Sequence, residues 1–206
     1  LHLSLRRQRQ MCIRDSIGLV EVGVGLIPGG GGTKEMTLRA SDQFKKNDVE
    51  LNLLQEYFLN IGMGKTSTSG HEGYGLNYLM KNKDLIIMNK KNQISHAKKI
   101  ALQMHDNGYT KPIQRNDIKV LGQQALGAFY VGADSMLVGG YISDHDKKIA
   151  KKISNILAGG NLSQSTLVSE QYLLDLEREA FLSLCGERKT LERIQFMLKN
   201  GKPLRN

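Results

Sequence analysis

The sequence predicts a mostly helical α/β fold, in which a truncated ββα core over residues 17–110 is followed by a helical subdomain over residues 111–206. Two observations carry this prediction. Apolar residues alternate with glycines from Ile17 to Ile27, and a second apolar run covers Asp84–Met88. Both patterns are typical of short buried strands. Beyond residue 111, apolar residues recur at helical spacing between glycine-containing breaks, which indicates consecutive helices.

The first half should contain short, capped helices. Residues 28–32 are predicted to form a loop that leads to a helix capped by Thr33. Asn47, with Glu50 three residues later, resembles a capping box and predicts a helix that ends at Gly62. The free amides at the start of the helix after Thr33 would favour an acyl oxygen or a phosphate.

Further start and stop signals divide the rest of the chain. Ser69 and Glu72 repeat the capping pattern and predict the start of a short helix. This helix should run to about Leu76 and end at Asn77 in a left-handed conformation. A helix with an apolar face is expected over residues 93–105, followed by a polar crossing segment over residues 110–117. Four helices are then predicted, at about residues 122–138, 144–157, 165–184 and 188–199.

The first sixteen residues are interpreted as a non-native segment. Residues 6–16 back-translate to a nucleotide sequence that looks like a transposase-based sequencing adaptor. The other interpretation is a disordered basic arm or the start of a signal peptide, but no apolar core of signal-peptide length follows. We therefore leave residues 1–16 out of the fold, and we expect the native sequence to begin within a reading frame that was cut upstream of Ile17.

Composition limits the class of protein. The whole chain has 29 basic and 20 acidic residues, a net charge of +9, which falls to +6 without residues 1–16. This moderate charge does not by itself indicate nucleic-acid binding. Cys185 is the single remaining cysteine, so no disulfide framework is expected. No apolar run is long enough to span a membrane, and a cytoplasmic location is the simplest expectation.

Common nucleotide and metal motifs fail when they are tested by position. Gly23 and Gly25 begin like a dinucleotide-binding fingerprint, but the third glycine would have to stand where Pro28 does. Lys65 and its neighbours end like a phosphate-binding loop, yet Leu59 occupies the place of the first glycine of that motif. The five histidines form no ligand cluster, so no metal site is predicted.

Glu21 is the most informative residue of the chain. It carries the only charge between residues 17 and 33. Desolvation among Val20, Val22 and Ile27 should raise its pKa, which suits a group that gives and takes a proton near neutral pH. A glutamate at a strand edge that faces water or pairs with a lysine has the same spacing, and the pattern alone leaves both interpretations open.

The stretch from Ile17 to Thr33, IGLVEVGVGLIPGGGGT, resembles the motif of the crotonase family, in which a glutamate precedes an apolar run and a Pro-Gly-x-Gly-Gly-Thr loop. Glu21 stands at the position of that family's second catalytic glutamate. Residues 167–186 and the tail GKPLRN resemble the C-terminus of bacterial proteins that join a 3-hydroxyacyl-CoA dehydrogenase to an enoyl-CoA hydratase. The resemblance covers essentially all of residues 17–206.

This resemblance implies a crotonase-type (ClpP/crotonase-like) fold and the hydration of trans-2-enoyl-CoA in fatty-acid β-oxidation. It implies an acyl-CoA thioester as substrate, Glu21 as a catalytic residue, and substrate contacts at Gly23, Pro28, Gly29 and Gly30. No cofactor is expected in this chain, because NAD would belong to a missing dehydrogenase half. The first catalytic glutamate and the oxyanion hole would lie upstream of Ile17, so the chain alone is expected to be inactive.

Two other functions stay open at this stage. One is a basic helical binding module, although the lysines are spread over separate segments and lack interleaved aromatic residues. The other is a different reaction on the same fold, an isomerase or a thioester hydrolase, since a fold does not fix a reaction. Neither nucleic acid nor a membrane is an expected partner.

The C-terminal helices carry many charges, which are predicted to form solvated faces around an apolar core. A surplus apolar face would be a contact surface in a homo-oligomer. The charged residues assigned to solvent include Glu170, Asp175, Glu177, Arg178, Glu187, Arg188, Glu192 and Arg193, and the core residues are Leu173, Leu174, Leu176, Phe181, Leu182 and Leu184.

Overall fold

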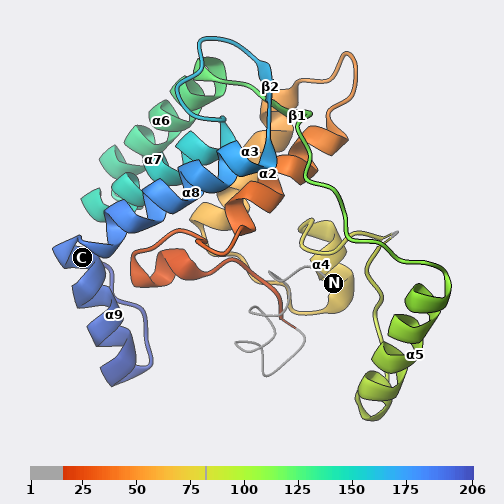
Figure 1. Ribbon diagram of the computed structural model, residues 1–206. Helices are drawn as coiled ribbons and strands as arrows, with labels where there is room; N and C mark the ends of the chain where they lie inside the picture. The colour runs from red at the N-terminus through yellow and green to blue at the C-terminus, as the bar shows by residue number, and fades with distance from the viewer. Residues whose placement is uncertain (1–15, 82) are drawn as a thin grey trace.

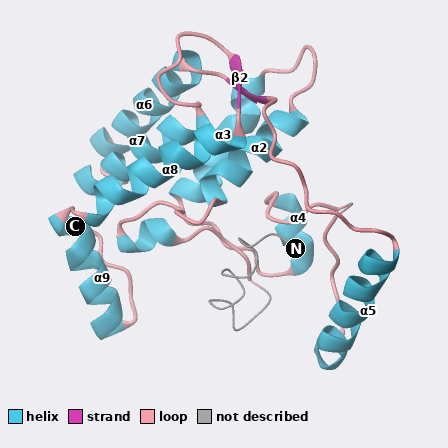
Figure 2. Cartoon of the chain, in the orientation of Figure 1, coloured by secondary structure: helices cyan, strands magenta, loops and turns pink. Residues whose placement is uncertain are grey.

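The computed structural model describes residues 16–81 and 83–206, so the prediction about residues 1–15 lies outside the described part. Five helices, α2, α3, α6, α7 and α8, pack side by side, whereas α5 stands apart from them (Figure 1). Helices dominate the described chain, and strand structure is confined to one short pair near one end of this bundle (Figure 2).

The elements follow one another in a simple order. The first half contains η1 (Glu21–Val24), α2 (Gly32–Gln43), α3 (Glu50–Gly62), α4 (Gly70–Gly75), η2 (Lys90–Asn92) and α5 (Gln93–Asp106). The second half contains β1 (Ile118–Val120), α6 (Gln123–Val138), α7 (Asp144–Leu157), β2 (Thr166–Val168), α8 (Glu170–Cys185) and α9 (Arg188–Asn200).

Helix α7 lies at the centre of the main hydrophobic core. Its buried residues Ile149, Ile153 and Ile156 are spaced four and three residues apart, which places them on one face of the helix. This helix packs against α2, α3, α6 and α8. Phe58 of α3 stacks on Phe129 of α6, with 4.8 Å between the ring centroids. The core therefore joins both predicted parts of the chain, residues 17–110 and 111–206.

A smaller core lies beneath the strand pair. Strands β1 and β2 are antiparallel, with Ile118 opposite Val168. Ile118 and Val120 point inward and pack with Leu38 of α2 and Leu173 of α8. The pair thus covers one end of the helical bundle and holds α2 and α8 together.

The predicted α/β crotonase-type fold with a ββα core is wrong, because the described chain is mostly helical with two short strands elsewhere. In the first predicted strand, Gly18 forms a single bridge with Thr66 and the chain then turns into η1. Gly25 has a φ of 85°, which a strand cannot accommodate. The second predicted strand, residues 84–88, has no regular structure and pairs with no strand among the described residues, and Leu85 and Met88 within it are exposed.

The helix predictions fared better than the strand predictions. The helices expected at residues 122–138, 144–157 and 188–199 are confirmed within about one residue as α6, α7 and α9. Ser69 caps α4 through the Glu72 amide, and Asn77 has the expected left-handed backbone. Two predicted caps are wrong: Gly31 and Val49, rather than Thr33 and Asn47, precede α2 and α3.

The start of α8 also differs from the prediction. Residues 166–168 pair with β1 as strand β2, so the helix begins only at Glu170. Ser169 caps this helix by accepting a hydrogen bond from the Tyr172 amide. Within the described residues, no helix is both long and apolar enough to cross a membrane.

Candidate functional site around Glu21

Glu21 is the first residue of η1, where the chain leaves the Gly18–Thr66 bridge. Its Oε2 atom is buried and has no hydrogen-bond partner among the described residues. Burial raises the pKa of Glu21, and the backbone amides of Glu21 and Val20 oppose this rise only in part. A carboxyl group with a raised pKa and an unpaired buried oxygen has the properties of a proton-transfer group.

The backbone that precedes Glu21 is fixed by the turn that follows α3. The Ile17 amide donates to Ser67 Oγ at 3.0 Å, and the Ser67 amide donates to the Ile17 carbonyl at 2.8 Å. Buried Tyr78 donates its hydroxyl to the Lys65 carbonyl in the same turn. Burial raises the pKa of Tyr78 to about 12, and the charge of Glu21 acts in the same direction. Tyr78 is therefore a neutral neighbour of Glu21.

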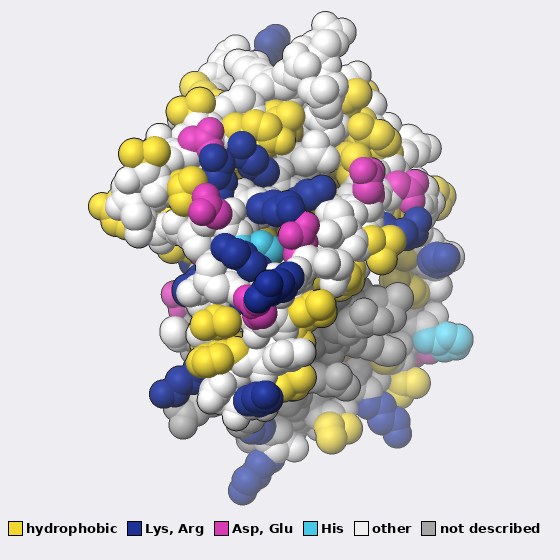
Figure 3. Space-filling view, turned by 90° about the vertical axis from the view of Figure 1, so that its left-hand side faces the viewer, with side chains coloured by type: hydrophobic (Ala, Val, Ile, Leu, Met, Phe, Trp, Pro, Cys, Tyr) yellow, Lys and Arg dark blue, Asp and Glu magenta, His cyan; other side chains and the backbone are white. Residues whose placement is uncertain are grey.

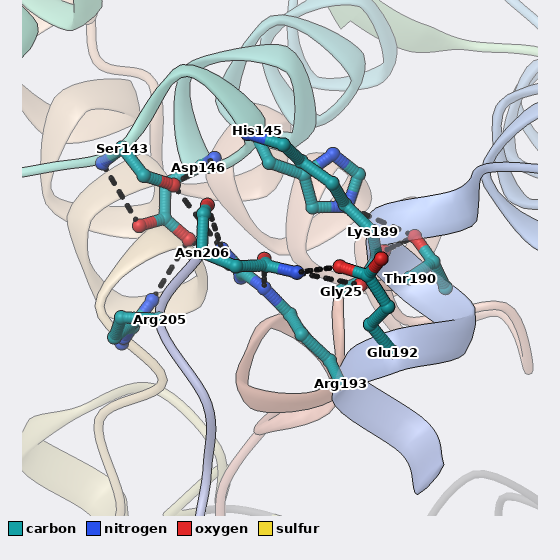
Figure 4. Close-up of polar contacts among 10 residues, drawn as sticks. All are labelled: Gly25, Ser143, His145, Asp146, Lys189, Thr190, Glu192, Arg193, Arg205 and Asn206. Atoms are coloured by element: carbon teal, nitrogen blue, oxygen red, sulfur yellow. Dashed lines mark hydrogen bonds and ion pairs between the residues drawn. The ribbon is translucent and has the colours of Figure 1, made fainter. Parts of the chain in front are cut away.

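The far end of η1 is held by helix α9. Buried Thr190 donates its hydroxyl to the Gly25 carbonyl at 2.8 Å, and its Oγ1 lies 2.9 Å from His145 Nε2 (Figure 4). The hydroxyl has one proton, which goes to Gly25, so Nε2 of His145 must donate to Thr190. A Cβ at Gly25 would lie 3.0 Å from the Thr190 Cα, so glycine permits this close approach.

Arg193 of α9 lies in a polar cluster beside this contact. Its side chain is fully buried and donates to Asp146 Oδ1 at 2.7 Å and to Asn206 Oδ1 at 2.8 Å (Figure 4). Burial alone would raise the pKa of Asp146, but hydrogen bonds from Arg193 and the Ser143 amide, together with the charges of Arg193 and Arg205, hold this pKa below its ordinary value. The hydrogen bonds and ion pairs of this cluster connect α7, α9 and the C-terminal tail. Helix α9 in turn contacts the end of η1 through Thr190.

His145 lies beside this cluster. Burial lowers its pKa, and the positive charge of Arg193 lowers it further, so the ring is neutral in the fold. On the face that carries α9, basic and acidic side chains lie next to one another with hydrophobic side chains around them (Figure 3). One ion pair near this helix joins Lys148 of α7 to Glu187.

The N-terminus of α2 is occupied by a side chain of the protein itself. The carboxylate of Glu177, 1% exposed, accepts hydrogen bonds from the Gly31 amide at 2.5 Å and the Lys34 amide at 2.9 Å. Burial raises the pKa of Glu177, while the amides of Lys34, Gly31 and Thr33 lower it in part. The expectation that free amides at this helix receive a ligand oxygen is thus met internally, by α8.

The predicted substrate-contacting residues follow one another along η1 and the loop to α2. Gly23 lies within η1, and Pro28 is buried and accepts a hydrogen bond from Thr33 Oγ1 at 3.4 Å. Gly29 and Gly30 are exposed, and a Cβ at Gly29 would collide with the ring of Phe181. Contacts between these residues and a substrate stay a prediction.

The described residues do not fit a nicotinamide dinucleotide. Such a cofactor places its pyrophosphate at a helix N-terminus that follows a glycine-rich turn. Here the nearest helix N-terminus, that of α2, already holds the buried carboxylate of Glu177, which would repel a second anion. Thr190 packs directly against Gly25 and donates a hydrogen bond to its carbonyl, so Thr190 occupies the space beside this glycine.

A metal site and a cavity are two other kinds of site that the described residues could form. In the part of the chain that the structure describes, no three His, Cys, Asp or Glu residues are placed to hold a metal ion. A cavity of about 380 Å³ lies between α3, α6, α7 and the C-terminal tail, and its lining includes Phe58, Met63, Met136, Asp146 and Arg205. Glu21 is not among the residues that line it, so this cavity is separate from the Glu21 site.

Sequence reasoning missed the residues that support the site. It assigned Glu177 and Arg193 to solvated faces, and both are buried. A signal for Glu177 was present: it lies four residues after Leu173 and three before Ala180, on the buried face of α8. A charge at such a position must be satisfied inside the protein. Of the predicted core residues, Leu173 and Leu184 are buried, whereas Leu182 is exposed.

Comparison with known proteins gives three relatives. The chain is 44% identical over 190 residues to a Bacillus subtilis protein named "Probable 3-hydroxyacyl-CoA dehydrogenase", a match that covers 92% of this chain and 23% of that protein. It is 27% identical to proteins of Rickettsia prowazekii and Rickettsia felis, each named "Putative fatty acid oxidation complex trifunctional enzyme", over 86% and 88% of this chain and 21% and 22% of theirs.

The chain spans less than a quarter of the length of these relatives. No protein-family model matches the chain, and no solved structure matches it. The chain is thus similar, over most of its length, to one protein named as a 3-hydroxyacyl-CoA dehydrogenase and to two named as fatty acid oxidation enzymes.

The comparison overturns the assignment as an enoyl-CoA hydratase. The relative with 44% identity is named as a dehydrogenase, an oxidoreductase and not a lyase. The error came from a short glycine-rich motif around Glu21, whose residues fold into a 3-10 turn instead of the expected strand. The resemblance at the tail was to proteins that join a 3-hydroxyacyl-CoA dehydrogenase to an enoyl-CoA hydratase, and the name of this relative supports only the dehydrogenase.

Proposed function

We propose that this chain is a helical part of a larger fatty acid oxidation protein that oxidises 3-hydroxyacyl-CoA with NAD. The observation that carries the proposal is the 44% identity, over 92% of the chain, to the Bacillus subtilis relative. The protein that would contain both this chain and the remaining segments of the relatives is called the parent protein below. Its cofactor would bind outside the matched stretch, because the described residues do not fit a dinucleotide.

Within this part, we assign to Glu21 the acceptance of the proton that the 3-hydroxyl group of the acyl-CoA loses when it is oxidised. Its buried, unpaired Oε2 and its raised pKa support this role. The exposed residues Gly29 and Gly30, in the loop after η1, are proposed to contact the substrate, together with Gly23 and Pro28. Glu177, Thr190 and His145 do not touch the substrate in this proposal; they position the backbone on which these groups lie.

A chimera tests the proposed function. In the Bacillus subtilis relative, the matched stretch is replaced by this chain, and the formation of NADH from 3-hydroxybutyryl-CoA is followed by absorbance. We expect the chimera to form NADH at a rate within about tenfold of the unaltered relative, because 44% identity preserves the core. A folded chimera without activity, or an unaltered relative without activity, would contradict the proposal.

A further inference from the structure

Helix α5 is amphipathic but has no buried side chain. Its apolar residues repeat at spacings of three and four and share one face of the helix. Ile94, at the start of this face, is 85% exposed. In Figure 1 the helix extends away from the bundle of α2, α3, α6, α7 and α8. The apolar face consists of Ile94, Ala97, Ile100, Ala101 and Met104.

The segments on both sides of α5 expose apolar side chains as well. Met88 before the helix is 86% exposed, and Ile113 after it is 91% exposed. A helix of 14 residues is marginally stable in water by itself, and helices in proteins gain most of their stability by packing an apolar face. Met88, Ile94 and Ile113 thus add exposed apolar side chains to a helix that gains little stability from packing in the described fold.

Charge gives this surface a second property. Lys90 and Lys91 precede α5, and Lys98 and Lys99 lie within it. Among the residues that the structure describes, none of these four lysines has a carboxylate within ion-pair distance. A complementary surface would have an apolar groove with acidic residues along its edge.

We propose that the apolar face of α5 docks onto the part of the parent protein that lies outside the matched stretch. This inference rests on the proposed relationship to a larger fatty acid oxidation protein. The relatives carry more than three quarters of their length outside the stretch that matches this chain, which provides ample surface for such a contact. The occupant is thus a region of the same polypeptide, joined to α5 through the chain.

The size of the face favours this occupant over a second copy of the chain. A helix of this length spans about 21 Å, and its apolar face covers roughly 200 Å². A stable interface between separate molecules buries about 800 Å² on each partner. A contact within one polypeptide needs far less area, because covalent linkage gives effective concentrations on the order of millimolar.

Hydrogen exchange of the α5 amides tests the docking. In the chain alone, residues 93–106 should exchange nearly as fast as an unprotected helix, whereas in the chimera exchange should slow by about 100-fold. The substitutions Ile94→Asp and Met104→Asp should abolish this protection in the chimera. Gln103→Asp, on the polar face of the same helix, introduces the same charge and should leave the protection unchanged.

Equal exchange in the chain and in the chimera would overturn the docking. Protection that appears in the chain alone and grows with its concentration would assign the face to a second copy instead. If the chimera fails to fold, the corresponding segment is measured in the unaltered Bacillus subtilis relative, and rapid exchange there overturns the proposal too. NADH formation is scored separately, so an inactive chimera with a protected α5 would contradict only the proposed function.

Discussion

Glu21 has two features that a buried glutamate with only a structural role usually lacks. It lies at the first position of η1 with one buried oxygen that no described group satisfies, and burial raises its pKa. An unsatisfied buried polar atom costs on the order of 1–3 kcal/mol, a cost that a protein retains where function requires it. The proposed proton transfer rests on this one carboxyl group.

The variant Glu21→Gln tests this cost through its pH dependence. Folding raises the pKa of Glu21 above its ordinary value of 4.5, so the ionised form disfavours the fold. The penalty is absent below 4.5 and complete once the pH exceeds the raised pKa. From acid to neutral pH, the unfolding free energy of the variant should therefore rise relative to that of the unaltered chain.

Urea unfolding at several pH values measures this difference. Glu56→Gln provides the control, because Glu56 is an exposed glutamate of α3 and should show no such trend. A constant difference between Glu21→Gln and the unaltered chain across this pH range would mean that folding does not raise the pKa of Glu21.

At the scale of elements, α8 holds the loop beside Glu21 through one carboxylate. Glu177 satisfies the Gly31 and Lys34 amides at the N-terminus of α2. Glu177→Ala leaves these partly buried donors without their carboxylate partner and should lower the unfolding free energy by on the order of 2 kcal/mol. Glu179→Ala, an exposed position on the same helix, should change it by less than about 0.5 kcal/mol. Thermal unfolding of both variants measures the contrast, and equal losses would refute this role.

Helices α7 and α9 and the tail form a second such unit, centred on Arg193. Removing one partner of a buried ion pair costs about 3–5 kcal/mol, so Arg193→Met should destabilise the chain by that order. Arg188→Met removes an ion pair from the same helix, but the Arg188 side chain is almost fully exposed, and the expected loss is below about 1 kcal/mol. Denaturant unfolding compares them; a loss in Arg193→Met no larger than that in Arg188→Met would argue against a structural role for the cluster.

Local sequence signals predicted helices well because capping and apolar spacing are local properties. Helices α6, α7 and α9 were found to within about one residue. Strands could not be predicted in this way, since Ile118–Val120 pairs with a segment almost fifty residues later. The same limit applies to the site: Glu21 was visible as a lone charge, but the partners of its loop, Glu177 and Thr190, come from distant helices.

In the whole molecule, two features suit a contact with groups outside the described chain: the Glu21 site and the apolar face of α5. The site at Glu21 is built from η1 and its supporting helices, and the apolar face of α5 contains no buried residue. The relatives are more than four times as long as the stretch they share with this chain. Both features are consistent with a helical part that works together with the rest of a fatty acid oxidation protein.

The most direct test of the central claim is the titration of the Glu21 carboxyl carbon by NMR, with and without 3-hydroxybutyryl-CoA, using Glu21→Gln to assign the signal. We expect the free chain to titrate above 4.5 and the thioester to shift the midpoint further, because a bound substrate would remove the partly exposed Glu21 residue from solvent. A midpoint at 4.5 that the thioester leaves unchanged would contradict the assignment of Glu21 as the proton-transfer group of this chain.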